Sequence, residues 1–317
     1  MAANSTNVVR ERSGDTSVRG SSDRPGASRR VRRARWIGYA YLAPAGTLYL
    51  LFVLVPGIHT VWLSLFRWDG VTVGKWVGLT NYREVAENPL LRGAMVHALV
   101  LITFFAGFSI IVGLLMAAIL GRHRRSGMTF YRVVFFLPQI VPMVAVGITW
   151  RWMYTENGAV NQILRAIGLD SITQAWLGSF TLALPAVGLI GTWALSGLCF
   201  VLFLSGAQKI DNSLYEAARM DGAGAVREFF AVTLPALRGE IAVALTITVV
   251  AALASFDIVY VTTNGSPGNT TTVPGLLVYR LAFTGGQVGV ASALAVTLTV
   301  LIIGIVVLIQ RLTRETT

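Results

Sequence analysis

The chain has 317 residues, of which 54% are hydrophobic and 13% are charged, and its formal net charge is +11. This charged fraction is about half that of soluble domains, which excludes an ordinary soluble domain and indicates a membrane protein. The basic residues cluster at the ends of apolar runs, so we attribute the positive charge to membrane topology and expect no nucleic acid partner. The single cysteine, Cys199, excludes an intrachain disulfide, and we interpret it as a small buried hydrophobic residue.

The first 35 residues are rich in Ser, Gly and Arg and contain no apolar stretch. We therefore expect no cleavable signal peptide, and a disordered basic tail in the cytoplasm. Its clustered arginines fit either contact with anionic lipid headgroups or a simple topological anchor. After this tail (1–35) we expect a first transmembrane helix with its outer loop (36–90), a transmembrane domain (91–311) and a cytoplasmic tail (312–317).

Six apolar stretches are long enough to cross a bilayer, which takes about 20 residues in a helix. They lie at 37–66, 94–120, 129–150, 180–205, 241–262 and 287–310. Pro138 and Pro142 predict a bend or a break in the third span. Gly188, Gly191 and Gly197 predict close helix contacts in the fourth. The expected fold is an all-α membrane protein with six transmembrane helices.

The distribution of Lys and Arg predicts the orientation of these spans. With the N-terminus inside, 19 of the 26 basic residues fall in cytoplasmic segments and seven in outer segments. Because basic residues concentrate on the cytoplasmic side, we expect both termini in the cytoplasm of a multi-pass protein in the cell membrane. Residues 206–239 are then cytoplasmic, and the long loops at 67–93 and 151–179 are outside.

No catalytic motif is present in the chain. It contains no G-x-x-x-x-G-K-[ST], so we expect no P-loop nucleotide site, and no G-x-S-x-G or H-E-x-x-H. The three histidines, His59, His97 and His123, are far apart and do not pair with Cys or carboxylates at metal-ligand spacing. We therefore expect no catalytic residue, no metal and no cofactor in this chain.

Three residues of the apolar spans are candidates for contact with a solute. Asp257 lies near the end of the fifth span, where an ionisable group is costly and commonly faces a cavity or a partner. It fits either a solute path or local pairing, for example with Arg280. Trp193 and Tyr260 fit either stacking on a sugar ring or ordinary packing between helices.

A polar, small-residue stretch at 213–235 separates two apolar spans. Ser213 and Glu216 have the spacing of a capping box, which predicts the start of a helix. Gly222 can end this helix in a left-handed conformation. Residues 223–230 then predict a second short helix. Such a compact helix–Gly–helix unit on a membrane surface suits docking to a partner protein.

This stretch, EAARMDGAGAVREFFAVTLP, resembles the EAA motif of permease subunits of binding-protein-dependent ABC importers. Val232 stands where the motif commonly has isoleucine. Residues 135–154 and 255–283 resemble carbohydrate-type members, the maltose- and glycerol-phosphate-type permeases, although Ser266 replaces the second glycine of their usual Thr-x-Gly-Gly-Pro. The resemblance covers about residues 37–311. The motif matches are Glu216, Ala217, Ala218, Asp221, Gly222, Ala223, Phe229, Leu234 and Pro235.

The resemblance implies a type I ABC importer permease fold with a cytoplasmic coupling helix. It implies that this chain pairs with a second, similar permease subunit and docks on a cytoplasmic ABC ATPase dimer, which holds the ATP and Mg. An extracellular solute-binding protein would deliver a sugar to the outer loops. Phe229 and Phe230 would anchor the unit beneath the membrane domain. The residues implied to couple to the ATPase are Glu216, Ala217, Ala218, Asp221, Gly222 and Ala223, and Asp257, Tyr260 and Trp193 are candidates for the solute path.

Three other functions remain to be weighed. An ion-coupled secondary transporter would need more ionisable groups inside the membrane than Asp257 alone. An ABC permease for a non-carbohydrate solute, such as a peptide or an amino acid, would share the motif, but residues 255–283 favour carbohydrate. A structural or receptor protein of the membrane would leave the ordered unit at 213–235 without a purpose.

Overall fold

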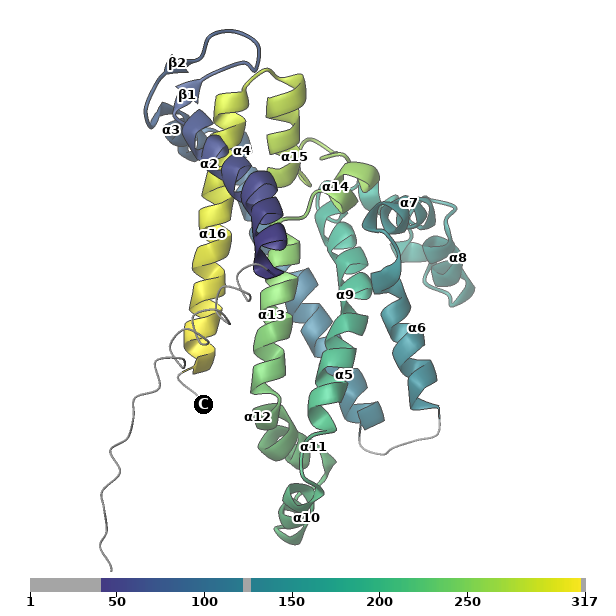
Figure 1. Ribbon diagram of the computed structural model, residues 1–317. Helices are drawn as coiled ribbons and strands as arrows, with labels where there is room; N and C mark the ends of the chain where they lie inside the picture. Colours follow the sequence, from purple (N-terminus) through teal and green to yellow (C-terminus); the bar gives the residue numbers. More distant parts are fainter. Residues whose placement is uncertain (1–40, 122–126, 315–317) are drawn as a thin grey trace, which may run out of the picture. The chain divides into compact units, whose positions relative to one another are not determined.

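The computed structural model describes residues 41–121 and 127–314, and the chain divides into two compact units, Met1–Pro56 and Gly57–Thr317. The predicted tail at 1–35 lies outside the described residues. In the first unit, residues 41–56 are helical and include a π-helical segment, η1 (Leu50–Leu54), before α2 (Val55–Leu63) begins. Almost all the other described elements are helices too (Figure 1).

Four described helices are long and apolar enough to cross a membrane: Tyr41–Leu63, Pro89–Leu120, Ala183–Ala207 and Val288–Thr313. They coincide with the first, second, fourth and sixth predicted spans. The second comprises α4 (Pro89–Ile102), η2 (Thr103–Phe108) and α5 (Ser109–Gly121). It starts where the Asn88 side chain accepts from the Leu90 amide, with a proline at the first position, where its missing N–H costs nothing. The fourth is α9 (Ala183–Ala207), and the sixth lies in α16 (Val288–Arg314).

The third predicted span is broken, as its prolines predict. It forms α6 (Met128–Ile140) and α7 (Met143–Met153), which meet at an angle of 93°. Pro142 disfavours the helical conformation for the residue before it, and Val141 is extended. Pro138, by contrast, lies inside α6 without ending it.

The prediction of one continuous fifth span at 241–262 was wrong. The helix α13 (Arg238–Leu253) ends at Ala254, and α14 (Asp257–Thr262) starts after Phe256, whose φ of −136° and ψ of −56° are not helical. Gly275 packs against this break, since a Cβ there would lie 3.2 Å from the Ser255 carbonyl oxygen. Ser255 and Asp257 flank Phe256 at the break, but the stretch is otherwise apolar, so hydropathy alone does not reveal the break. At its other end α13 meets the helical segment Ala225–Ala236 at 71°.

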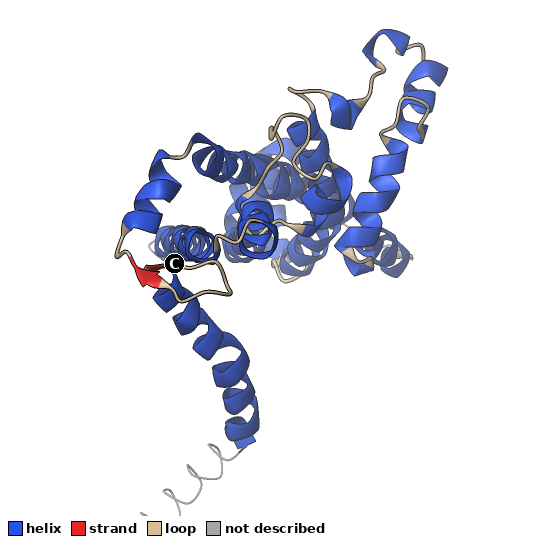
Figure 2. Cartoon of the chain, turned by 90° about the horizontal axis from the view of Figure 1, so that it is seen from above, coloured by secondary structure: helices blue, strands red, loops and turns tan. Residues whose placement is uncertain are grey.

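The remaining elements are short. Strands β1 (Phe66–Arg67) and β2 (Lys75–Trp76) pair antiparallel, with Phe66 opposite Trp76, and are the only strands among the described residues (Figure 2). This hairpin was not predicted. The other short helices are α3 (Thr80–Glu87), α8 (Ala159–Ala166), η3 (Asp170–Ile172), η4 (Trp176–Gly178), α10 (Asn212–Met220), α11 (Ala225–Glu228), η5 (Phe229–Thr233), α12 (Leu234–Ala236), α15 (Pro274–Tyr279) and η6 (Arg280–Thr284).

Helix α9 is at the centre of the packing and contacts both α5 and α6. Its glycines lie against neighbouring helices, which confirms their predicted role. A Cβ at Gly197 would lie 1.7 Å from the Phe135 carbonyl oxygen, and a Cβ at Gly191 would lie 1.9 Å from the Phe105 ring. Cys199 is fully buried, as predicted. The close approach of these helices therefore depends on residues without side chains.

Candidate functional site

We define the docking unit as residues 211–237, which contain α10, α11, η5 and α12 and project beyond the ends of α9 and α13 (Figure 1). Asp211 is the N-cap of α10, and its Oδ1 accepts from the Ser213 amide at 2.9 Å. The predicted capping box that starts at Ser213 was wrong, because Ser213 already lies inside the helix. Hydrogen bonds from the Ser213 amide and then from its hydroxyl lower the pKa of Asp211 below its ordinary value.

The first helix of the docking unit ends as predicted, at Gly222. Its φ is +77°, a left-handed conformation that glycine adopts without a Cβ penalty. The Gly222 amide donates to the Arg219 carbonyl and the Ala223 amide to the Ala218 carbonyl, each at 2.9 Å. This pair of bonds is a Schellman motif, which satisfies the last carbonyls of α10 and turns the chain sharply.

The second helix of the docking unit is longer than predicted. It begins at Ala225, two residues later than predicted, and stays helical through η5 to Ala236. The expected end of this helix at Phe230 was therefore wrong. Pro235 falls in the first turn of α12, just after the π-helical turn, where the absence of its N–H is tolerated.

Two side-chain contacts hold α10 against the second helix, and we call these four residues the clasp. The Arg219 Nε donates to the Glu228 Oε1 at 3.0 Å, and the Tyr215 hydroxyl is 3.0 Å from the Thr233 Oγ1. Tyr215 and Arg219 are four residues apart, so they lie on the same face of α10. Glu228 is 3% exposed. The clasp was not predicted, because no spacing rule relates residues across a turn.

The opposite face of α10, which we call the free face, is open. Met220 is 88% exposed, and Glu216 and Ala217 are also exposed. Of the other predicted coupling residues, Asp221 and Gly222 are exposed, whereas Ala218 and Ala223 are half-buried. Ala218 is one residue before Arg219 and three after Tyr215, so it belongs to the clasp face.

The predicted anchors lie in η5. The Phe229 and Phe230 ring centroids are 5.3 Å apart in an edge-to-face arrangement. Phe229 is half-buried and Phe230 is exposed. Only Phe229 is therefore covered by the described residues.

The candidate solute-path residues lie in separate surroundings. Trp193 in α9 packs edge-to-face on Trp150 with centroids 5.6 Å apart, and Tyr260 in α14 stacks on Phe256 at 5.2 Å. Trp193 is 43% and Tyr260 42% exposed, so both rings keep an open edge. Within residues 41–121 and 127–314, no ring contact joins Trp193 to Tyr260.

Asp257 is exposed at the first position of α14. Of the two alternatives for Asp257, local pairing with Arg280 is not found among the described residues. The Arg280 guanidinium donates instead to the backbone oxygen of Asn264 and, at 3.1 Å, to the side-chain oxygen of the same residue. Asp257 therefore stays available as a candidate for the solute path.

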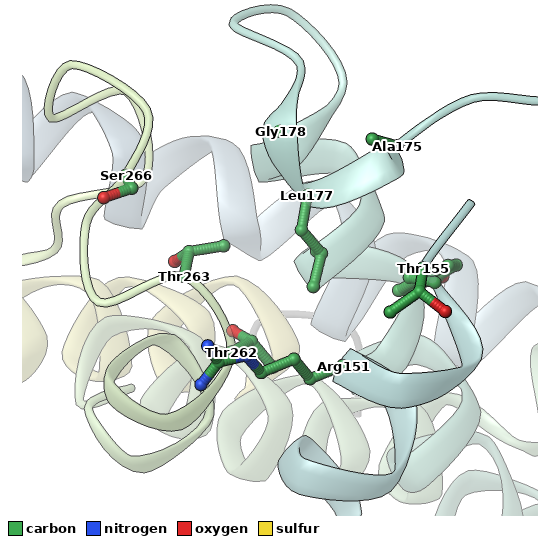
Figure 3. A pocket seen from close by; sticks show the side chains of 9 residues that line it. Arg151, Thr155, Ala175, Leu177, Gly178, Thr262, Thr263 and Ser266 are labelled. Carbon is green, nitrogen blue, oxygen red and sulfur yellow. The ribbon is translucent and has the colours of Figure 1, made fainter. Parts of the chain in front are cut away.

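A pocket of about 370 Å³ lies at the end of α7 (Figure 3). It is lined by Arg151, Tyr154, Thr155, Ala175, Leu177, Gly178, Thr262, Thr263 and Ser266. The sequence reasoning did not find this Arg151 pocket, because its walls come from three separate segments of the chain. Within residues 41–121 and 127–314, no group of three or more His, Cys, Asp or Glu residues could hold a metal ion.

The described helices form an apolar bundle with broken spans that ends in a helix–Gly–helix unit. A solved structure with this fold has a TM-score of 0.75 and 23% identity, and the match covers 90% of this chain and 97% of that chain. It belongs to a bacterial ABC transporter involved in the import of the acidic polysaccharide alginate.

The chain belongs to the family of binding-protein-dependent transport system inner membrane components, which matches it over residues 109–314. It is 36% identical over 268 residues to the probable ABC transporter permease protein YurN of Bacillus subtilis, covering 84% of this chain and 91% of that protein. It is 33% identical over 291 residues to the diacetylchitobiose uptake system permease protein NgcF of Streptomyces coelicolor, covering 86% and 82%. The predicted family is confirmed, and an ion-coupled secondary transporter is set aside.

Proposed function

We propose that this chain is the permease subunit of an ABC importer that carries a sugar or a sugar derivative across the cell membrane. Membership of the binding-protein-dependent family supports import, and the relative named for diacetylchitobiose uptake supports carbohydrate over peptides or amino acids. The four long helices and the two bent pairs can make up six spans. The excess of basic residues in the alternate loops supports cytoplasmic termini.

The observation that carries the proposal is the docking unit with its open free face, whose two helices are joined by the clasp contacts. In the proposed complex, α10 docks through this face into a cytoplasmic ABC ATPase dimer. ATP and Mg are bound by that ATPase, and this chain is not catalytic. The exposed Met220 and Ala217 supply apolar contact area, and Glu216 and Asp221 flank them with negative charge.

The clasp gives this docking a mechanical consequence. A displacement of α10 is passed through the Arg219–Glu228 and Tyr215–Thr233 contacts to the second helix and then across the 71° bend into α13. The membrane domain then has two packings that are biased by ATP at the docking unit and by a loaded extracellular binding protein at the far side. A second, similar permease subunit completes the solute path, to which Trp193, Tyr260 and Asp257 contribute.

Transport by the reconstituted complex tests the proposal. We would reconstitute the chain with its copurifying subunits and binding protein in proteoliposomes and measure uptake of radiolabelled oligosaccharides with and without ATP. We expect uptake that requires both ATP and the binding protein. Uptake driven by an ion gradient without ATP would contradict the ABC mechanism, and ATP-driven uptake of peptides but of no sugar would contradict the carbohydrate cargo.

A further inference from the structure

The Arg151 pocket contains one charged side chain and no carboxylate. Its lining consists of Arg151, five hydroxyl-bearing residues and three small or apolar ones. Figure 3 shows the Arg151 side chain extending from α7 toward Thr262, below Leu177. The pocket therefore presents a positive charge that no acidic lining residue compensates. A planar guanidinium in this position suits a carboxylate or a phosphate.

Most hydrogen-bond donors of Arg151 are not used within the described protein. Its Nη1 donates to the Val261 carbonyl oxygen at 3.5 Å, which is the upper limit for a hydrogen bond. A guanidinium has five N–H donors in a fixed fork, and this contact uses one. Arg151 thus stays near the end of α14 and still has donors for a bidentate contact with an oxyanion.

The pocket threonines already use their hydroxyl hydrogens. Thr155 donates to the Trp152 carbonyl at 2.8 Å, Thr263 donates to the Val259 carbonyl at 3.3 Å, and Thr262 donates to the Ile258 carbonyl. A hydroxyl has one hydrogen and two acceptor lone pairs. The Thr263 oxygen also accepts from the Thr271 hydroxyl at 2.8 Å. The acceptor positions that remain on the threonine oxygens suit a ligand that carries O–H groups.

We propose that the Arg151 pocket binds a ligand with a carboxylate and several hydroxyl groups, which is the chemistry of an acidic sugar. Arg151 pairs with the carboxylate, and the threonine oxygens accept from the sugar hydroxyls. Leu177 and Ala175 supply an apolar surface for the C–H face of the ring. An acidic protein side chain or a lipid phosphodiester would use Arg151 but has no hydroxyls for the threonines. As a site for cargo, the inference rests on the proposed sugar import.

Calorimetry on the full-length chain, copurified with its partner subunits and embedded in phosphatidylcholine nanodiscs, tests the proposal. The probes are glucuronate and glucuronamide, which have the same ring and differ in the charge. We expect glucuronate to bind at least about tenfold more tightly than glucuronamide, because only the carboxylate forms charge-assisted hydrogen bonds with Arg151. Equal binding of both probes, or no binding of glucuronate, would overturn the proposal.

Three variants locate the binding. We expect R151Q to lose the preference for glucuronate and R151K to keep part of it. R165Q is the matched control, because Arg165 is exposed in α8, donates to the Glu156 carbonyl at 3.1 Å and does not line the pocket. If R165Q loses the preference for glucuronate as fully as R151Q does, the preference arises from the general positive charge of this surface, and the assignment to Arg151 is overturned. Weaker attachment of the binding protein in R151Q, without glucuronate binding by the wild type, would make the pocket a protein-docking site instead.

The same preparation separates this proposal from the proposed function. ATP-driven uptake of a neutral oligosaccharide with no binding of glucuronate would leave sugar import standing and reject the acidic-sugar site. Binding of glucuronate that depends on Arg151, with no ATP-driven uptake of any sugar, would reject sugar import and leave the site in place.

Discussion

Arg219 in α10 donates to Glu228 in α11 at 3.0 Å, across the turn that Gly222 makes between the two helices. The Glu228 side chain is 4% exposed and the Arg219 side chain 55%. A buried carboxylate is costly unless it is paired, so the pair favours one angle between the helices. The orientation of the free face of α10 depends on this angle.

Breaking the clasp should weaken the link between the ATPase and the membrane domain. We expect R219A to speed hydrogen exchange in α10, with a loss of about 1–2 kcal/mol in the local opening free energy, because Arg219 is half-exposed. In the reconstituted complex, sugar uptake per ATP hydrolysed should fall. The critical readout is the ratio of sugar uptake to ATP hydrolysis. Simple unfolding of the subunit would reduce both sugar uptake and the ATP hydrolysis that sugar stimulates, and would leave this ratio unchanged.

The reversed pair R219E/E228R should recover part of the exchange protection. R227A removes an exposed arginine of the same unit and is the control. The clasp has no coupling role if R219A and R227A transport equally well per ATP.

Substitutions at Gly222 should show the effect of backbone strain at the turn without any new side-chain clash. Nothing lies within 4 Å of a Cβ at Gly222, so Gly222→Ala costs only the left-handed backbone, about 1–2 kcal/mol. Gly222→Pro cannot adopt the φ of +77° and should abolish uptake while the chain still inserts into the membrane. Gly224 is equally open but has a φ of −77°, so Gly224→Ala should transport normally. Normal transport by Gly222→Pro would show that the turn is dispensable.

Asp211 should make the start of α10 sensitive to acid. Because the folded-state pKa of Asp211 is lowered from 3.8, its capping stabilisation is fully present above that value and is lost as the pH falls through the lower folded value. Hydrogen exchange in α10, corrected for intrinsic rates, should therefore be slower at about pH 5 than at about pH 3. D211N keeps an acceptor that does not titrate and should remove the pH difference. Unchanged protection in D211A at about pH 5 would exclude Asp211 as the cap.

A methyl group at Gly197 should disrupt the packing of α6 on α9. The Cβ would meet the backbone carbonyl of Phe135 at 1.7 Å, and a backbone atom cannot move aside as a side chain can. We expect Gly197→Ala to lose about 1–3 kcal/mol of stability in thermal unfolding of the purified protein. Gly304→Ala in α16 meets nothing within 4 Å and should unfold at or above the wild-type temperature. The close helix contact is refuted if the two variants unfold alike.

Helix ends and breaks were predictable from the sequence where they depend on single residues. Gly222 ends a helix because left-handed backbone favours glycine, and Pro142 breaks the third span because it disfavours the helical conformation at Val141, which is extended. The start of α10 was misplaced because both Asp211 and Ser213 are good caps, and spacing alone does not choose between them. The break between α13 and α14 has only Ser255 and Asp257 as local polar signals in an otherwise apolar stretch, and these two residues do not by themselves distinguish a broken span from a continuous one.

Contacts between separate segments were not predictable from the sequence. Arg219 and Glu228 meet only because a turn reverses the chain between them. Arg280 donates to Asn264 and not to Asp257, because the fold of the loop brings Asn264 next to the guanidinium. The Arg151 pocket likewise assembles three segments that no periodicity relates. The family resemblance predicted the docking unit and its class of partner, whereas the clasp and the division of α10 into two faces come from the structure.

The most direct test of the central claim is a crosslink from the free face of α10. In a Cys199→Ala background, Met220→Cys would be treated in native membranes with a thiol-to-amine crosslinker, and the product identified by mass spectrometry. We predict a product with a protein that carries the G-x-x-x-x-G-K-[ST] motif of a P-loop ATPase, and a much weaker product from the half-buried Ala218→Cys. Free labelling of Met220→Cys by a water-soluble maleimide in the intact complex, with no crosslink to an ATPase, would contradict the account.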